Sequence, residues 1–292
     1  MCHLESNAFA STQSSKAVGM EGQTLRRNAP SVLNVVYQKS LLHDGREHDL
    51  ALQVWLPLLA ADEMANPSIG HVLRRLQSLP GYLDAFSKVY PDRGIAVDTI
   101  GDAIAAYEST LLSANSRFDR WLFGRDKGAL TAAEQEGLAL FTGKAGCASC
   151  HRIELDHALF TDHEFHNTGI GYRATMQRDR QYSVQLAPGE STVVRDAELR
   201  SVAEGVKGDI GRFEITLKSE HRWAYKTPSL RNVTLTPPYM HDGSIATLAE
   251  VVRYYNEAVL LTMVWIRVLR KLGLTPQEQD NLLAFLGALV GE

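Results

Sequence analysis

The sequence predicts a mainly α-helical protein made of two similar domains, with few short strands. Three observations lead to this prediction. Apolar residues recur near the helical period after capping residues, alternation with a period of two is scarce, and one segment occurs twice. The 292 residues, of which 45% are hydrophobic and 22% charged, suffice to build domains with real cores.

Helix starts are marked most clearly by two capping boxes, Thr131–Glu134 and Thr275–Glu278. In such a box the Thr and Glu side chains satisfy backbone N–H groups that have no partner within the helix. Leucines and phenylalanines follow both boxes at helical spacing, and Ile100, Ile104 and Tyr107 are spaced in the same way. We therefore expect helices in all three places.

Strand signals are short and lie in one polar, glycine-containing stretch from about Thr168 to Lys218. The best candidates are Ser191–Val194 and Phe213–Leu217, which are rich in β-branched and aromatic residues. We expect this stretch to be a loop-rich excursion from the helical domains.

The repeated segment suggests a tandem duplication. Pro30–Val35 (PSVLNV) matches Pro228–Val233 (PSLRNV), and thirteen residues after each proline comes His-Asp-Gly, at His43 and at His241. The two copies are 198 residues apart throughout, as from His43 to His241, without a gap. The composition also turns polar between Ser113 and Lys127, so we expect domains at 1–125 and 126–292.

A cysteine-histidine motif lies upstream of the second copy. Cys147-Ala-Ser-Cys150-His151 has the C-x-x-C-H spacing at which two thiols add to the vinyl groups of haem while the histidine ligates iron. A thioredoxin-like motif or half of a zinc site are the alternatives. The first needs a βαβ context and the second another ligand pair, whereas a helical pattern runs into this motif. We expect covalent haem c here.

Cys2-His3 lies upstream of the first copy. We expect it to be the end of a second C-x-x-C-H motif whose first cysteine precedes the numbered start, so that the first domain lacks its beginning. A stray Cys-His pair is the alternative. No secretory signal is present in the chain as written, but covalent haem attachment of this kind needs export, and we expect the periplasm.

Composition and charge exclude several classes of protein. Thirty Lys and Arg against thirty-four Asp and Glu give a net charge of −4, without the basic surface of a nucleic-acid binder. The longest apolar stretch, 258–266, is far shorter than the roughly 20 residues of a membrane span. Three cysteines form no disulfide framework.

Taken together, these and further motifs resemble those of the bacterial di-haem cytochrome c peroxidases and their relative MauG, a tryptophan-oxidising enzyme. The resemblance covers nearly the whole chain. The matching stretches are Arg27–Ser31, His43–Arg46, Glu63–Met64, Cys147–His151, Phe160–Asp162, Phe165–Gly169, Pro228–Val233 and Pro238–Gly243. The resemblance implies two cytochrome c-like haem domains.

The resemblance also implies ligands for the two haem irons. His3 would be the proximal ligand of the N-terminal, peroxidatic haem, and His151 that of the C-terminal, electron-transfer haem. The sixth ligand of the latter lies fourteen residues past the His of the second His-Asp-Gly motif, which is Tyr255. Methionine is usual there in the peroxidases and tyrosine in MauG-like enzymes. The alternative for Tyr255 is a packed aromatic on its helix face.

At the N-terminal haem the resemblance implies an open face for peroxide. Pro57 lies 198 residues before Tyr255 and has no side chain that binds iron. Glu63, six residues later, matches the acid/base carboxylate of the family, although a surface charge is its alternative reading. Gln53 matches a position near the same pocket.

Two positions depart from the family pattern. His43 occupies the place of the inter-haem tryptophan, and since histidine is a poorer electron relay, fast transfer between the haems is in doubt. Trp55 is nearby in sequence but does not match that place. Met20 stands where many peroxidases have a distal histidine, and we expect it to face away.

The resemblance further implies a calcium ion between the domains. Its ligands would be Asn28 and the backbone carbonyls of Thr236 and Pro238, since oxygen donors suit this cation. The alternative is that Asn28 only caps a turn. The remaining histidines form no recognisable metal site and are expected at the surface or behind the iron ligands: His157, His163, His166 and His221.

The expected function is activation of hydrogen peroxide at the N-terminal haem, with electrons arriving through the C-terminal haem. A small c-type cytochrome or a cupredoxin would be the donor. Alternatively, the enzyme is MauG-like and oxidises aromatic residues of a partner protein, or it is a mono-haem electron carrier if the N-terminal haem is absent. The sequence leaves the oligomeric state open, with a homodimer among the options.

Overall fold

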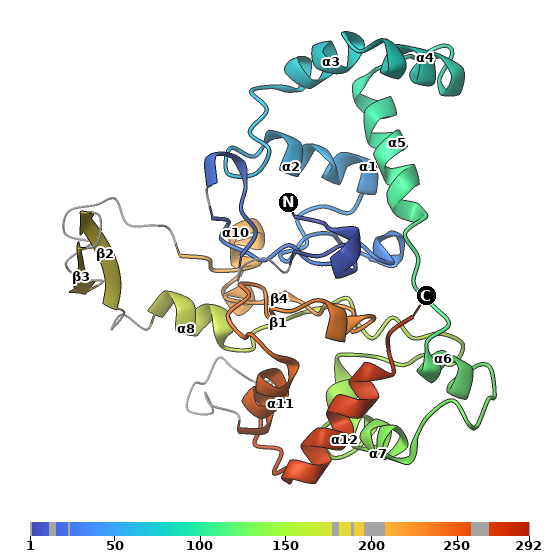
Figure 1. Ribbon diagram of the computed structural model, residues 1–292, viewed down its shortest axis with the longest axis vertical. Helices are drawn as coiled ribbons and strands as arrows, with labels where there is room; N and C mark the ends of the chain where they lie inside the picture. The colour runs from blue at the N-terminus through green and yellow to red at the C-terminus, as the bar shows by residue number, and fades with distance from the viewer. Residues whose placement is uncertain are drawn as a thin grey trace.

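The computed structural model of the chain is mainly helical, with two small antiparallel sheets (Figure 1). It describes residues 2–11, 16–22, 24–176, 181–187, 190–195, 208–257 and 269–291. Its helices and strands are α1 (Leu50–Gln53), α2 (Trp55–Leu59), α3 (Ile69–Gln77), α4 (Pro80–Val89), α5 (Val97–Ser109), α6 (Arg117–Leu122), α7 (Ala132–Thr142), β1 (Phe165–His166), α8 (Ile170–Met176), β2 (Gln181–Ala187), β3 (Glu190–Arg195), α10 (Phe213–Thr216), β4 (Tyr225–Lys226), α11 (Leu248–Glu257) and α12 (Pro276–Gly287).

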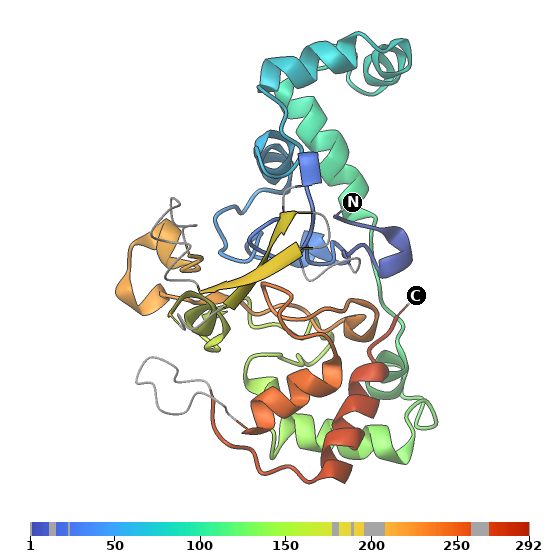
Figure 2. The same cartoon turned by 60° about the vertical axis from the view of Figure 1, so that its left-hand side comes forward.

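The helices gather at two ends of the molecule. Helices α1 to α5 lie at one end and α6, α7, α11 and α12 at the other, with the β1–β4 pair between them (Figures 1 and 2). The β2–β3 hairpin projects to one side (Figure 1). Within the described residues, no helix has the length and apolar character that crossing a bilayer requires.

The two capping boxes form as predicted. The Thr131 and Thr275 side chains each accept a hydrogen bond from the backbone N–H three residues later, and they begin α7 and α12. These two helices pack closely because Gly137 has no Cβ, which would lie 2.0 Å from the Asn281 carbonyl oxygen. The predicted helix around Ile100 is also confirmed, as α5.

Aromatic side chains form the core of the C-terminal end. Phe118, Phe141, Phe160 and Phe285 are almost fully buried, and their rings meet at centroid distances of 5.1 to 6.4 Å. Burial of one such ring stabilises the fold by about 1.5–3 kcal/mol. Cys147 packs against this cluster, so the core supports the cysteine-histidine motif directly.

One of the two strand predictions is confirmed and the other is wrong. Ser191–Val194 lies within β3. Phe213–Leu217 instead forms the short helix α10, which ends where Leu217 turns left-handed with φ 57°. The Glu214 carboxylate accepts from the Ile210 N–H and binds Arg26, so a tertiary contact outweighs the strand preference of this segment. Other parts of the expected excursion, 177–180, 188–189 and 196–207, lie outside the described residues.

The two copies of the repeated segment have the same backbone conformation. Asn34 and Asn232 are both left-handed, with φ values of 59° and 58°, and each is followed by a 3-10 turn. The isolated β-bridge between Leu41 and Glu47 is matched by one between Tyr239 and Ile245. Similar sequence has therefore produced similar local structure in both halves.

Candidate functional site

The C-x-x-C-H motif sits on a 3-10 turn, Cys147–Ser149, just after α7. The Nδ1 of His151 lies 2.9 Å from the Phe160 carbonyl oxygen, which sets the ring so that Nε2 stays available to a metal. Burial lowers the pKa of His151, which keeps the imidazole neutral, and raises the pKa of the Cys147 thiol to about 11. Thiols on one turn and a neutral imidazole with a free nitrogen fit the thioether bonds and the axial ligand of covalent haem.

Tyr255 lies on α11 close to this motif. Its side chain is partly buried and lies beside Tyr254, at a ring-centroid distance of 5.7 Å. Burial raises the pKa of Tyr255, and the nearby Tyr254, Cys147 and Cys150 add to the rise. The structure therefore brings the tyrosine chosen from sequence into the electrostatic neighbourhood of both motif cysteines, more than 100 residues away in the chain.

The N-terminal Cys2-His3 pair repeats the histidine geometry. The Nδ1 of His3 lies 3.0 Å from the Phe9 carbonyl oxygen, as the Nδ1 of His151 faces that of Phe160. Burial raises the pKa of the Cys2 thiol, and the charge of Glu63 contributes to the rise. Glu63 is therefore a neighbour of the Cys2-His3 pair in the folded chain.

Glu63 is held at the loop that follows α2. The Met64 N–H donates to the Pro57 carbonyl at 3.1 Å, and the Met20 N–H donates to the Glu63 carbonyl at 2.8 Å. Burial raises the pKa of the half-buried Glu63 carboxyl and Asp62 adds to the rise, whereas Arg46 opposes it. A carboxyl with a raised pKa is suited to receive and return a proton.

Two neighbouring predictions can be placed beside Glu63. The Met20 side chain is 53% exposed, and that it faces away from the haem stays a prediction. Gln53 ends α1, four residues before Pro57 in the next helix. Trp55 is buried with Val72 in the apolar core of the N-terminal helices.

His43 lies partly buried between the two halves of the chain. Its Nε2 is 2.9 Å from the Asn28 carbonyl oxygen, and its own carbonyl accepts from the Lys226 N–H at 2.8 Å. Burial lowers the pKa of His43 to about 4, so the ring is neutral near pH 7. His43 is therefore a neutral, hydrogen-bonded imidazole at the position where the resemblance noted from sequence implies a tryptophan.

A stacked pair of rings lies in the same region and was not predicted from sequence. His241 and Tyr225 lie face to face, with ring centroids 3.5 Å apart and planes 15° apart. The His241 carbonyl accepts from the Asn28 N–H at 2.7 Å. The repeat pointed to His241, but no sequence signal pointed to its partner, because the two residues meet only through the chain path.

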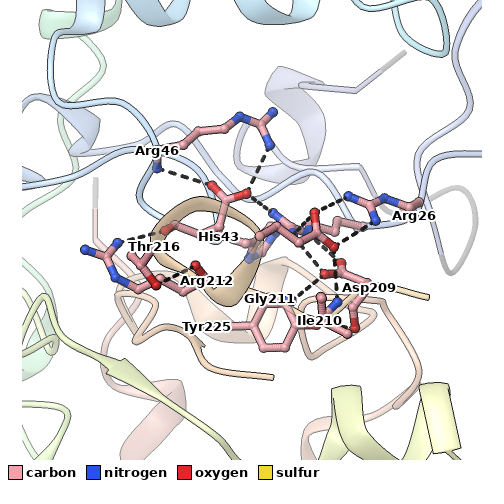
Figure 3. A network of polar contacts seen from close by, with 12 residues as sticks. Arg26, His43, Arg46, Asp209, Ile210, Gly211, Arg212, Thr216 and Tyr225 are labelled. Atoms are coloured by element: carbon pink, nitrogen blue, oxygen red, sulfur yellow. Dashed lines mark hydrogen bonds and ion pairs between the residues drawn. The ribbon is translucent and has the colours of Figure 1, made fainter. Parts of the chain in front are cut away.

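An ionic network joins residues 26–46 to residues 209–216 (Figure 3). Arg27 bridges two carboxylates, with 2.6 Å from Nη1 to Asp44 Oδ2 and 2.6 Å from Nε to Asp209 Oδ2. Asp44 is fully buried and also binds Arg46, at 3.0 Å. Gly45 follows with φ 67°, where a Cβ would lie 2.2 Å from the Phe165 ring. The network thus holds the first His-Asp-Gly motif against the second half of the chain.

A second polar cluster adjoins the C-x-x-C-H motif. Ligand atoms of Cys150, Asp162 and His166 all lie within 4.8 Å of one another, and His166 Nε2 is 2.7 Å from Asp162 Oδ2. Cys150 and Asp162 raise the pKa of His166 to about 9. His166 therefore lies beside the motif. The sequence analysis had left open whether it lies at the surface or behind the iron ligands. His157 is at the surface, paired with Asp156.

The expected calcium ligands come together in part. The Asn28 side-chain amide donates from Nδ2 to the Pro238 carbonyl at 3.0 Å, while its Oδ1 accepts from the Ala29 N–H. Thr236 ends the 3-10 turn just before Pro238. A cation bound by both oxygens needs the amide turned over, so that Oδ1 faces the carbonyl.

Comparisons with known proteins converge on one family. The family model described as di-haem cytochrome c peroxidase matches residues 1–127. The methylamine utilization protein MauG of Methylorubrum extorquens is 32% identical over 292 residues, which are all of this chain and 72% of the relative. The cytochrome c551 peroxidase of Pseudomonas aeruginosa is 31% identical over 94% of this chain and 68% of its own. The crystal structure of a MauG-like protein associated with microbial copper homeostasis superimposes with a TM-score of 0.77 at 28% identity, covering 100% of this chain and 83% of that one.

Proposed function

This chain belongs to the di-haem cytochrome c peroxidase family, and from that premise we propose how it divides the work between two haem sites. As an oxidoreductase acting on peroxide, it receives hydrogen peroxide at the N-terminal site around His3. Electrons enter at the C-terminal site of Cys147, Cys150 and His151. When bound, haem c supplies the redox-active iron at both sites.

The observation that carries this proposal is the shared geometry of two histidines. His3 and His151 each direct Nδ1 to a backbone carbonyl, at 3.0 and 2.9 Å, so Nε2 of both rings would be free to hold haem iron. The backbones of Pro30 and Pro228, which head the two copies of the repeat, lie in hydrogen-bonding range of the same two rings. This supports a tandem duplication with one haem domain in residues 1–125 and one in 126–292.

The difference between the two sites supports different roles for them. Tyr255, a potential ligand, lies near Cys147 and Cys150, whereas its counterpart in the repeat is Pro57. With Tyr255 as a ligand, the C-terminal site would be closed to peroxide, whereas the N-terminal site beside Pro57 would stay open. The open site is the one where Glu63 stands, next to Cys2.

Glu63 moves the proton that peroxide cleavage requires. Its carboxylate oxygen takes the proton from the near oxygen of hydrogen peroxide and returns it to the departing hydroxide, which leaves as water. Glu63 is half-buried, and Gln53 ends α1, four residues before Pro57. His43 stays neutral between the halves and takes no part in this proton transfer.

Haem attachment is the first expectation to test. Replacing Cys147 by serine, and separately Cys2 by serine, is expected to lower the covalent haem content of protein matured in a periplasm. The measurement is the pyridine haemochrome spectrum together with intact mass. If the Cys2 variant kept the haem content of the wild type, Cys2-His3 would not be a haem site, and the mono-haem electron carrier would replace the peroxidase proposal.

Tyr255 distinguishes the MauG-like alternative, because a phenolate ligand stabilises ferric and higher iron. Replacing Tyr255 by methionine is expected to raise the reduction potential of the C-terminal haem and to change its optical spectrum. Tyr254→Phe is the matched control, since its buried phenol donates to the Thr168 carbonyl instead. Equal potentials in wild type and the Tyr255 variant would make Tyr255 a packed aromatic without a ligand role.

The partners and location follow from the same proposal. A small c-type cytochrome or a cupredoxin delivers electrons in the periplasm, and the MauG-like alternative replaces this reaction with oxidation of aromatic residues in a partner protein. A calcium ion held by Asn28, Thr236 and Pro238 would tie the halves together. The proximity of Asn28 and the Pro238 carbonyl supports this site.

A further inference from the structure

Lys226 is a mostly buried lysine at the boundary between residues 1–125 and residues 126–292, which we call the seam. It lies on β4, which pairs with β1 in the register Phe165–Lys226 and His166–Tyr225. Its Nζ donates to the Ser40 carbonyl at 2.5 Å, and its backbone N–H donates to the His43 carbonyl at 2.8 Å. The side chain therefore crosses from the C-terminal half into the first repeated segment.

The ammonium group of Lys226 has no negative partner among the described residues. Its one hydrogen bond goes to a neutral carbonyl, and no carboxylate of the described part of the chain lies within ion-pair distance. Burial alone lowers its pKa to about 8. A buried charge is costly unless it is paired, and the other buried cation of this seam, Arg27, has two carboxylates.

A second polar group beside it also lacks a partner. Ser40 is 3% exposed, and its hydroxyl oxygen is buried without a hydrogen bond in the described structure. Buried hydroxyls are nearly always hydrogen-bonded, so one left over next to an uncompensated ammonium group indicates that a ligand completes the site. An ammonium group and a hydroxyl are both donors, and together they suit a carboxylate.

We propose that Lys226 and the Ser40 hydroxyl bind a propionate carboxylate of the haem attached at Cys147 and Cys150. The proposal rests on the proposed haem attachment at that motif. The seam would then bind part of the haem, a role that neither the repeat nor the cysteine motif indicates.

The chain path brings Lys226 to this haem rather than to open solvent. Pro228, two residues later, has its backbone in hydrogen-bonding range of His151, and two residues span at most about 7 Å. On the paired strand, His166 lies within 4.8 Å of Cys150. Both the axial histidine and one thioether cysteine therefore border the strand pair that carries Lys226.

The test uses holoprotein matured in a periplasm, with the potential of each haem followed by spectroelectrochemical titration. Lys226→Met is expected to lower the C-terminal potential at pH 7, because an uncompensated propionate stabilises ferric iron. At acidic pH the potential should return towards that of the wild type as the propionate protonates. Ser40→Ala is expected to shift it less, in the same direction, and Lys226→Arg to restore most of it.

Lys39→Met is the matched control, since it removes the same charge one residue from Ser40 but from an exposed side chain. It should leave both potentials unchanged. The proposal is overturned if the potentials of Lys226→Met equal those of the control, or if only the N-terminal haem responds. It is also overturned if inorganic phosphate shifts the wild-type potential but not that of Lys226→Met, which would identify a free anion as the ligand.

The covalent haem content of each variant separates this proposal from the one on which it rests. If wild-type protein carries no haem at Cys147 and Cys150, the proposed function has failed. If haem is present and the potentials do not move, only the propionate site has failed. Should Lys226→Met lose its haem, Ser40→Ala and Lys226→Arg still decide the question, because both keep the fold close to that of the wild type.

Discussion

Replacing Glu63 by glutamine is expected to lower the rate of peroxide turnover by about 10²- to 10⁴-fold, the usual contribution of a positioned acid/base group. Glutamine has nearly the same shape but cannot take a proton from peroxide. Haem content and the reduction potentials should be unchanged. Steady-state turnover with a reduced small cytochrome, alongside the optical spectrum of the resting protein, measures both.

The pH profile provides the internal check on Glu63. Burial and Asp62 raise the pKa of Glu63 above its usual value of 4.5, so the active carboxylate form is lost as the pH falls through that raised pKa. Glu63→Gln should abolish this acidic limb. Asp62→Asn is the control and should shift the limb to lower pH, because a repulsive charge is removed. A Glu63 variant with wild-type rate and profile would show that another group moves the proton.

Replacing Asp44 by alanine is expected to lower the free energy of unfolding by about 3–5 kcal/mol, as for other buried ion pairs that lose one partner. Asp44 is fully buried and binds both Arg27 and Arg46. Without it, Arg27 keeps Asp209 but loses the carboxylate on its other side. Chemical denaturation of the holoprotein, followed by far-UV circular dichroism, measures the effect.

The sign of the pH dependence follows from the same contacts. Burial alone would raise the pKa of Asp44, but the two arginines hold it below its usual value. Asp44 therefore contributes its full stabilisation of the fold at any pH above the pKa that it has in the unfolded chain. That stabilisation is lost as the pH falls through the lowered, folded value. Asp84→Ala is the matched control, because its pair with Lys88 is solvent-exposed, and it should cost no more than about 0.5 kcal/mol. A similar small loss in the Asp44 variant would contradict the role of the network.

Local signals in the sequence were sufficient for much of the fold. Capping boxes act within four residues, so Thr131 and Thr275 begin helices in the folded chain as predicted. The spacing of Cys147, Cys150 and His151 is also local, since one turn of backbone sets it. The strand preference of Phe213–Leu217 led to a wrong prediction, because a carboxylate bonded to a distant arginine stabilises a helical turn there.

The candidate site also combines residues that local sequence signals predict with contacts that only the tertiary structure determines. Tyr255 and Glu63 were predicted from sequence by their spacing from the repeated motifs, and each lies within electrostatic reach of a cysteine of a Cys-His motif. The His166 contact with Cys150, the Tyr225–His241 stack and the Lys226–Ser40 hydrogen bond depend on which distant segments meet. Burial and pairing of charges are properties of the packed chain. The sequence determines the spacing of residues within one turn of backbone. The partner of a side chain across the seam depends on how the two halves pack against each other.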